Sequence, residues 1–209
     1  MNIAALVLGA LLPGLALAQF DIDRPELGPG DSWTWVSKDS VARTESKSTR
    51  EITAKENDKY TTRITYEKDG RVTNSISGLT LDLNRIRRVK GEVSDSGWFK
   101  FPLTQGKSWQ AKEPWPDGNG YVAVTYTAAG KEQITVPAGS FDSIKVIGEG
   151  RWFNTSTKGE DVTEVSIWYA PAVRGIVRYH ERRWMRGAIG LDVTDELVSY
   201  KLAADSPVK

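Results

Sequence analysis

VPAGSFD at residues 136–142 and WYAPAVRG at residues 168–175 frame the stretch of sequence that decides the fold. In each segment an apolar, strand-like run meets a corner rich in Pro and Gly, and a second strand-like run follows. Proline lacks the N–H group that a sheet ladder needs, and glycine adopts the backbone angles of a tight turn. We therefore predict two strand–corner–strand units, with Phe141 and Trp168 packed into the core.

The chain after residue 19 shows the same pattern throughout. Short runs rich in Val, Ile, Thr, Tyr and Trp alternate with Gly, Asp, Asn and Pro, and no long stretch has the helical period. The pattern predicts an all-β fold, an antiparallel meander that forms a curved sheet, a half-barrel or a sandwich. Tight connections are expected at residues 68–71, 129–130 and 187–190. The candidate strands are residues 32–38, 44–54, 59–68, 72–77, 80–90, 97–101, 108–112, 121–129, 131–136, 143–154, 161–170, 175–186 and 190–202.

The first 18 residues have the features of an export signal. Residues 3–18 are nearly all apolar and uncharged, and Ala16 and Ala18 supply the small side chains that a signal peptidase reads. The run is short for a spanning helix, which needs about 20 apolar residues. We predict an N-terminal signal helix over residues 1–18 and a single antiparallel β domain over residues 19–209, with two halves that meet near residues 91–120. An uncleaved membrane anchor is the alternative.

The composition excludes several kinds of binding and metal site and favours certain cellular compartments. The 209 residues carry 28 Lys and Arg against 27 Asp and Glu, and the formal net charge of +1 argues against nucleic-acid binding through bulk charge. The chain has no Cys, which excludes disulfides and thiolate sites, and its only His is His180, which excludes two-His metal sites. We expect no metal and no cofactor. Export without disulfides favours a periplasmic or secreted bacterial protein, and no segment after the signal is apolar enough to cross a membrane.

Tryptophan and arginine supply the candidate binding residues. Trp usually packs in cores, but several together also line apolar grooves. Trp115 lies between two prolines in EPWP at residues 113–116, where a loop position favours a contact role. The candidate binding residues are Trp98, Trp115, Trp152, Arg182 and Arg183.

Two basic runs, at residues 85–90 and 182–186, allow two interpretations. On a strand Arg85 and Arg87 face one way while Arg88 and Lys90 face the other, so the first run is split between faces. Charge of this kind often discourages edge-to-edge strand pairing. The alternative is a contact with a lipid head group or a cell-wall polyanion.

The two corners resemble those of a family of exported bacterial β-proteins that carry the pattern VPAGtFda.kV … WYAPgvG.V. The segment FPLTQGKSW at residues 101–109 also belongs to that pattern, so the resemblance covers roughly residues 101–179. The chain departs from it at Ala172 and at an inserted Arg174. The resemblance implies an antiparallel β fold and export. Related-looking families include curved sheets similar to periplasmic lipoprotein-carrier half-barrels, which implies a concave face for an apolar ligand. It supplies no catalytic residue.

Two functions from different classes remain open. The leading hypothesis is a non-enzymatic module of the bacterial envelope that binds a hydrophobic or lipid-like small molecule, or an envelope protein. The alternative is a hydrolase of cell-wall or glycan material, which requires two carboxylates in one cleft.

Overall fold

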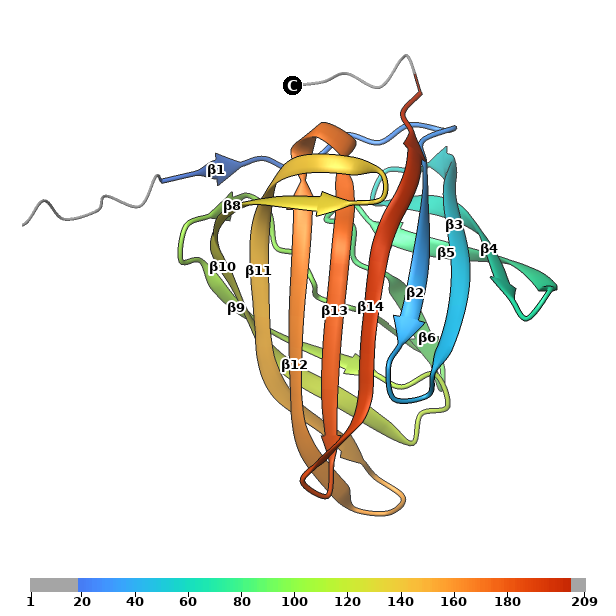
Figure 1. Ribbon diagram of the computed structural model, residues 1–209, viewed down its shortest axis with the longest axis vertical. Coiled ribbons are helices and arrows are strands. Elements are labelled where there is room, and N and C mark those ends of the chain that lie inside the picture. The colour runs from blue at the N-terminus through green and yellow to red at the C-terminus, as the bar shows by residue number, and fades with distance from the viewer. Residues whose placement is uncertain (1–18, 204–209) are drawn as a thin grey trace, which may run out of the picture.

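The computed structural model of the protein describes residues 19–203, and the predicted signal segment lies outside them. Ten strands form one antiparallel sheet, which curves so that its two ends turn away from the central strands (Figure 1). The sheet is open, because its edge strands β5 and β9 do not pair with each other. The prediction of an all-β, antiparallel, curved sheet is confirmed. Its strands, in spatial order, are β5 (Arg71–Thr80), β4 (Lys59–Lys68), β3 (Thr44–Lys55), β2 (Ser32–Asp39), β14 (Ala188–Lys201), β13 (Gly175–Met185), β12 (Gly159–Ala170), β11 (Gly139–Asn154), β10 (Gly120–Val136) and β9 (Ser108–Pro114).

The first and last long strands of the described chain join the two halves of the sheet. Strands β2 to β5 form one meander and β9 to β14 form another, and β2 pairs with β14 at their seam. Trp35 of β2 stands opposite Leu197 of β14 in this pairing. The seam is tied further where the backbone N–H of Ala203 donates to the buried carboxylate of Asp31, 2.6 Å away.

Both corners of the deciding stretch form as predicted. Pro137 and Ala138 make the turn between β10 and β11, and Phe141 is buried just after it. The second corner is a short 3₁₀ turn, η1 (Pro171–Val173), which ends at Arg174 with a left-handed φ of 50°. The Arg174 guanidinium pairs with Asp31 at 3.7 Å, and both side chains are buried. The inserted residue therefore anchors the corner to the loop before β2.

Two predicted boundaries are wrong. Residues 129–130 form no turn, because β10 continues through a register shift between Ala128 and Gly130. This irregularity is a β-bulge. A Gly after a small residue looks the same in the sequence whether it forms a bulge or a turn. Residues 80–90 are not one strand either: β5 ends at Thr80, and β6 (Ile86–Val89) then pairs with β7 (Glu92–Asp95) in a separate hairpin.

Residues 81–102, which we call the crossing segment, pass over the inner face of the sheet. The segment leaves the β5 edge, where Arg85 bridges to Leu79, and reaches the β9 edge, where the Trp109 indole donates to the Gly97 carbonyl at 2.8 Å. The prediction of a strand at residues 97–101 is wrong, because no strand ladder holds them. The Asn84 side chain instead bonds both the N–H and the carbonyl of Phe99, each at 2.9 Å. The open sheet is thus spanned from edge to edge by its own chain.

Glycine shapes the inner face where the sheet bends. A Cβ atom on Gly148 would lie 2.5 Å from the ring of Tyr126, so only glycine lets that ring lie against β11.

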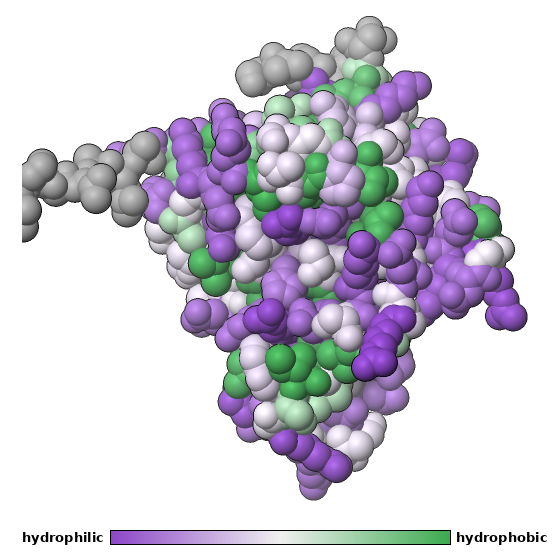
Figure 2. Space-filling model, in the orientation of Figure 1, coloured by the Kyte–Doolittle hydropathy of each residue, from purple (hydrophilic) through white to green (hydrophobic). Residues whose placement is uncertain are grey.

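Two further short strands, β1 (Asp21–Ile22) and β8 (Leu103–Thr104), pair near one end. The outer face in Figure 2 is largely hydrophilic, with scattered apolar groups. Within residues 19–203 no helix has the length and apolar character needed to cross a membrane.

Candidate functional site: a cleft and a chamber on the inner face

A cleft of about 530 Å³ lies between the crossing segment and the inner face of β9, β10, β12 and β13. Alternation along these strands directs one set of side chains inward, and the crossing segment covers them. Most of the lining is apolar or aromatic. These residues are Trp98, Ala111, Pro114, Trp115, Pro116, Val122, Val124, Tyr126, Val165, Tyr179 and Met185.

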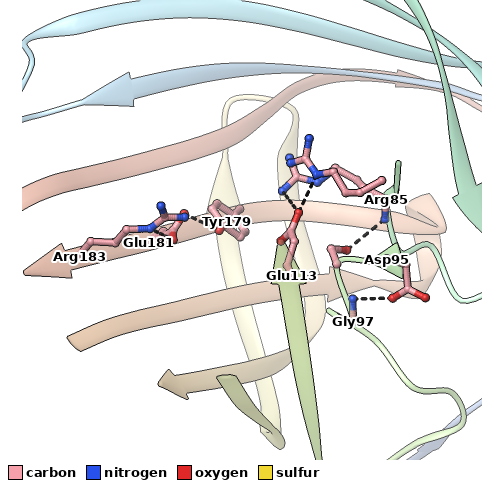
Figure 3. A network of polar contacts seen from close by, with 9 residues as sticks. Arg85, Asp95, Gly97, Glu113, Tyr179, Glu181 and Arg183 are labelled. Atoms are coloured by element: carbon pink, nitrogen blue, oxygen red, sulfur yellow. Dashed lines mark hydrogen bonds and ion pairs between the residues drawn. The ribbon is translucent and has the colours of Figure 1, made fainter. Parts of the chain in front are cut away.

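Two glutamates hold the three arginines of the cleft (Figure 3). Glu113 of β9 accepts a hydrogen bond from Arg87 Nε at 2.9 Å and lies 3.6 Å from Arg85. Glu181 of β13 accepts one from Arg183 Nε at 2.6 Å. The first pair joins the crossing segment to the opposite edge of the sheet, so it also fixes the roof of the cleft.

Aromatic rings separate the cleft from a second cavity. The Arg85 guanidinium lies 4.0 Å from the centroid of the Trp98 ring, and Trp98 stands 5.2 Å from Tyr179 between ring centroids. The Tyr179 hydroxyl donates to Glu181 at 2.8 Å. Burial, together with the nearby Glu181 carboxylate, raises the pKa of Tyr179 well above its ordinary value. The phenol is therefore a permanent hydrogen-bond donor at neutral pH.

Behind these rings lies a smaller cavity of about 110 Å³, which we call the chamber. Arg85, Trp98 and Tyr179 line both cavities. The remaining chamber wall comes from both halves of the sheet. Strands β2 to β4 supply Trp35, Ser48, Thr49, Arg50 and Ile64, and strands β13 and β14 supply Ile176 and Asp195.

Arg50 is the unmatched charge of the chamber. Its Nε atom is buried without a hydrogen-bond partner, and no carboxylate of the described chain forms an ion pair with it. Burial, and then repulsion from Arg85 and Arg87, lowers the pKa of the Arg50 guanidinium from 12.5 to about 9. At neutral pH the group is still a cation, held beside two others.

Two further buried polar atoms of the chamber lack partners. They are Nε of Arg85 and Oδ1 of Asp195. Burial raises the pKa of the Asp195 carboxyl, and a hydrogen bond with Ser37 opposes the shift only in part. A buried polar group without a hydrogen-bond partner costs about 1–3 kcal/mol, so three such atoms around one small space mark the chamber as a polar site.

The predicted binding residues divide between the two faces of the sheet. Trp98, Trp115 and Arg183 line the cleft. Trp152 stands behind Trp115, 6.1 Å between ring centroids, and its indole donates to the carbonyl of Trp184 at 2.7 Å. Arg182 does not line the cleft or the chamber and lies 3.5 Å from Asp192, which also contacts His180 at 2.8 Å.

Sequence reasoning missed Arg50, Glu113, Glu181 and Asp195. For Arg50 a signal exists, because strand alternation places it on the same face as Ile52, which is fully buried. For the three acidic residues nothing in the sequence distinguishes them from the other 24 of the 27. Glu113 gains its role by pairing with arginines of the crossing segment. Glu181 gains its role by bonding Tyr179 and Arg183 of its own strand, and Asp195 by its place in the chamber wall.

Three carboxylates line the cleft, where the hydrolase alternative requires a pair. Asp117 is exposed and accepts a hydrogen bond from the Asn119 N–H in the turn between β9 and β10. The other two are Glu113 and Glu181. Each is engaged by arginine, and Glu181 also accepts from Tyr179. A general acid must present its proton to a substrate, whereas these oxygens face guanidinium groups. The hydrolase therefore stays a prediction without further support. Among residues 19–203 no group of three or more His, Cys, Asp or Glu is placed to hold a metal ion.

Comparisons with known proteins identify the fold. No protein-family model matches the sequence, and no curated protein matches it either. A candidate lipoprotein from Parabacteroides distasonis ATCC 8503 superposes with a TM-score of 0.54 at 14% identity, covering 86% of this chain and 99% of its own. A candidate exported protein with a YmcC-like fold from Bacteroides fragilis NCTC 9343 gives 0.49 at 13% identity, with coverage of 86% and 99%. The hypothetical lipoprotein YmcC of Escherichia coli K12 gives 0.43 at 16% identity, with coverage of 81% and 84%.

At these identities the likeness concerns the fold alone. The Parabacteroides protein shares the overall architecture along nearly its whole length. The resemblance of the two corners to an exported family remains a prediction, because no family model matches. The chain is therefore similar in fold to a bacterial protein described as a candidate lipoprotein.

Proposed function

We propose that the protein is exported to the bacterial envelope, where it binds a small amphiphilic molecule whose apolar part lies in the cleft. The observation that carries the proposal is the cleft itself. Its volume of about 530 Å³ falls within the range of small-molecule sites, about 300–1,000 Å³. A mainly aromatic and aliphatic lining with a few fixed polar groups is also typical of such sites.

The polar groups of the cleft suit a ligand with a polar end. The Trp115 indole N–H is buried without a partner, at the turn between β9 and β10. A ligand oxygen would satisfy this donor, which an aliphatic chain alone would leave unpaired. The two matched arginine–glutamate pairs are fixed by their own bonds, so they shape the rim without demanding a charged ligand.

Export is supported by the signal-like residues 1–18. The protein of Parabacteroides with the same fold is described as a candidate lipoprotein, which agrees with an envelope location. An envelope protein as partner stays a prediction, for which the edge strand β5 offers unpaired backbone groups.

The test uses N-phenyl-1-naphthylamine, an uncharged fluorophore that brightens in apolar sites. We expect saturable uptake by the purified protein and its loss in Val165→Phe, which fills the floor of the cleft. Val162→Phe is the matched control, because Val162 lies on the same strand but is exposed and lines neither cavity. Circular dichroism verifies that both variants are folded.

Trp115→Ala provides a second variant that leaves the buried core intact, since Trp115 is only half-buried. It should weaken uptake by about tenfold, the equivalent of one lost aromatic contact of about 1.4 kcal/mol. Absence of saturable uptake by the wild-type protein, or equal uptake by Val165→Phe and Val162→Phe, would refute binding in the cleft.

A further inference from the structure

We propose that the chamber is a binding site for a small oxyanion, a carboxylate or a phosphate group, held between Arg50 and Arg85. The oxyanion site extends the proposed function. It depends on the ligand cleft only if the oxyanion is the head group of the amphiphile bound there. The site is distinct from the cleft in both charge and size.

The charge balance around the chamber is positive. The cations are Arg50 and Arg85 in its wall and Arg87 close by, and the anions are Asp195 in the wall and Glu113 beyond Arg85. Glu181 also acts on Asp195, but Arg183 pairs with it, so these two charges cancel. Three guanidinium groups therefore face two carboxylates when Asp195 is ionised, and one carboxylate when it is protonated. In either state a positive charge is left without a counterion inside the described chain. Buried charge is stable in proteins when it is paired, so the balance calls for an anion.

The hydrogen-bonding groups also fit an oxyanion. Arg50 and Arg85 each present a buried Nε–H without an acceptor, and guanidinium groups bind carboxylate and phosphate oxygens in a matching planar geometry. Water would satisfy these donors but would leave the charge of Arg50 uncompensated. A volume of about 110 Å³ exceeds the need of a single water and accommodates a small anion. The Asp195 carboxyl, when protonated, supplies a further donor on the opposite wall.

The anion has two possible sources with the same chemistry. It is either a free ion or the head group of a longer molecule, because the chamber and the cleft share Arg85, Trp98 and Tyr179. A head group in the chamber would let its chain run past these three side chains into the apolar cleft. Three probes separate the sources: inorganic phosphate, decyl phosphate and decanol.

Isothermal titration calorimetry on the purified protein provides the test. We expect one phosphate group to bind per chain, and Arg50→Met to weaken that binding at least about tenfold. Arg63→Met is the matched control, since it removes one positive charge from the neighbouring strand β4. Arg63 pairs with Glu51 at 3.2 Å, is 55% exposed and lines neither cavity, so binding should be unchanged.

Asp195→Asn keeps the shape of the chamber and makes it more positive, so phosphate should bind more tightly than to the wild-type protein. This second variant keeps the test informative if Arg50→Met folds poorly. Decyl phosphate that binds at least about tenfold more tightly than phosphate, and loses affinity in Arg50→Met while decanol does not, assigns a head group. Equal affinity for phosphate and decyl phosphate assigns a free ion.

The inference is overturned if neither phosphate nor decyl phosphate binds at millimolar concentration, which would mean that the chamber holds water. It is equally overturned if Arg50→Met and Arg63→Met have the same effect, because the response would then reflect bulk charge. Neither result concerns the uncharged fluorophore in the cleft. Failure of the oxyanion site and failure of the proposed ligand cleft are therefore separate observations.

Discussion

The cleft and the chamber lie on either side of the same three side chains, yet they treat charge in opposite ways. In the cleft, Glu113 and Glu181 match the arginines around them. In the chamber, Arg50 has no carboxylate partner among the described residues, although it is more deeply desolvated. Matched charges build a rigid wall and leave the space between them free for an apolar molecule. The unmatched charge of Arg50 is the basis of the oxyanion site that we propose.

The largest effect is expected from Trp98→Ala, which removes the ring that separates the cleft from the chamber. Trp98 is 7% exposed, and truncation of a buried aromatic residue costs about 3–5 kcal/mol. We expect the free energy of unfolding to fall by this amount in urea titrations. Trp115→Ala, at the half-buried mouth of the cleft, should cost clearly less. Equal losses in the two variants would show that Trp98 is not the structural divider.

A second variant, Glu113→Gln, should give the cleft unmatched arginine charges like that of the chamber. It leaves Arg85 and Arg87 without their carboxylate, and both arginines remain about one third exposed, which softens the loss. We expect the protein to lose about 1–2 kcal/mol of stability and to regain part of it in phosphate. Thermal unfolding with phosphate and with chloride at equal ionic strength measures both effects.

Glu132→Gln is the control for this change, because Glu132 is 47% exposed and its contact with Lys145 is 3.7 Å long. It should change stability by less than about 0.5 kcal/mol and should create no response to phosphate. A phosphate response of similar size in both variants would contradict the distinction between matched and unmatched arginines.

The smallest effect is expected from Asp195→Asn, and it depends on pH. Burial raises the pKa of Asp195 in the folded protein above its value of 3.8 in an unfolded chain. The folded state therefore holds the proton more tightly, and wild-type stability falls as pH rises through the interval between the two pKa values. The variant lacks this slope, so its stability relative to wild type should grow from pH 4 to pH 7.

Asp161→Asn should show the opposite sign. Backbone N–H groups of Val162 and Gly187 lower the pKa of Asp161, so its ionised form supports the folded state at neutral pH, and this support is lost as pH falls through the folded-state pKa. Urea titrations at several pH values compare the two variants. A pH-independent difference between Asp195→Asn and wild type would mean that the carboxyl is not desolvated in the chamber.

The sequence predicts those parts of the fold that depend on local chemistry. The corners at residues 136–142 and 168–175 follow from Pro and Gly, and Arg85 and Arg87 share a face as alternation requires, since both reach Glu113. The bulge at Ala128 is not predictable in the same way, because it depends on register with β11. The path of residues 97–101 depends on side chains that replace a strand partner, since Asn84 bonds the backbone of Phe99 and Trp109 bonds that of Gly97.

The site is less predictable than the fold for a related reason. Trp98, Trp115 and Arg183 could be nominated as residue types, and the structure places all three at the cleft. Arg50 and Asp195 acquire their meaning only when β3 and β14 come to lie on either side of β2. Alternation distinguishes the face of a strand, but it does not tell which distant charges will share a cavity.

The pairing of β2 with β14 also sets the order in which the chain can fold. Residues 32–39 find their second neighbour only in residues 188–201, near the end of the chain. Contacts between such distant segments form slowly, because a long loop must close first. A chain that leaves a ribosome or a translocation pore N-terminus first thus presents β2 as an unpaired edge until residues 188–201 have emerged. During that interval the edge is open to wrong partners, and a chaperone that covers one strand would protect the whole sheet.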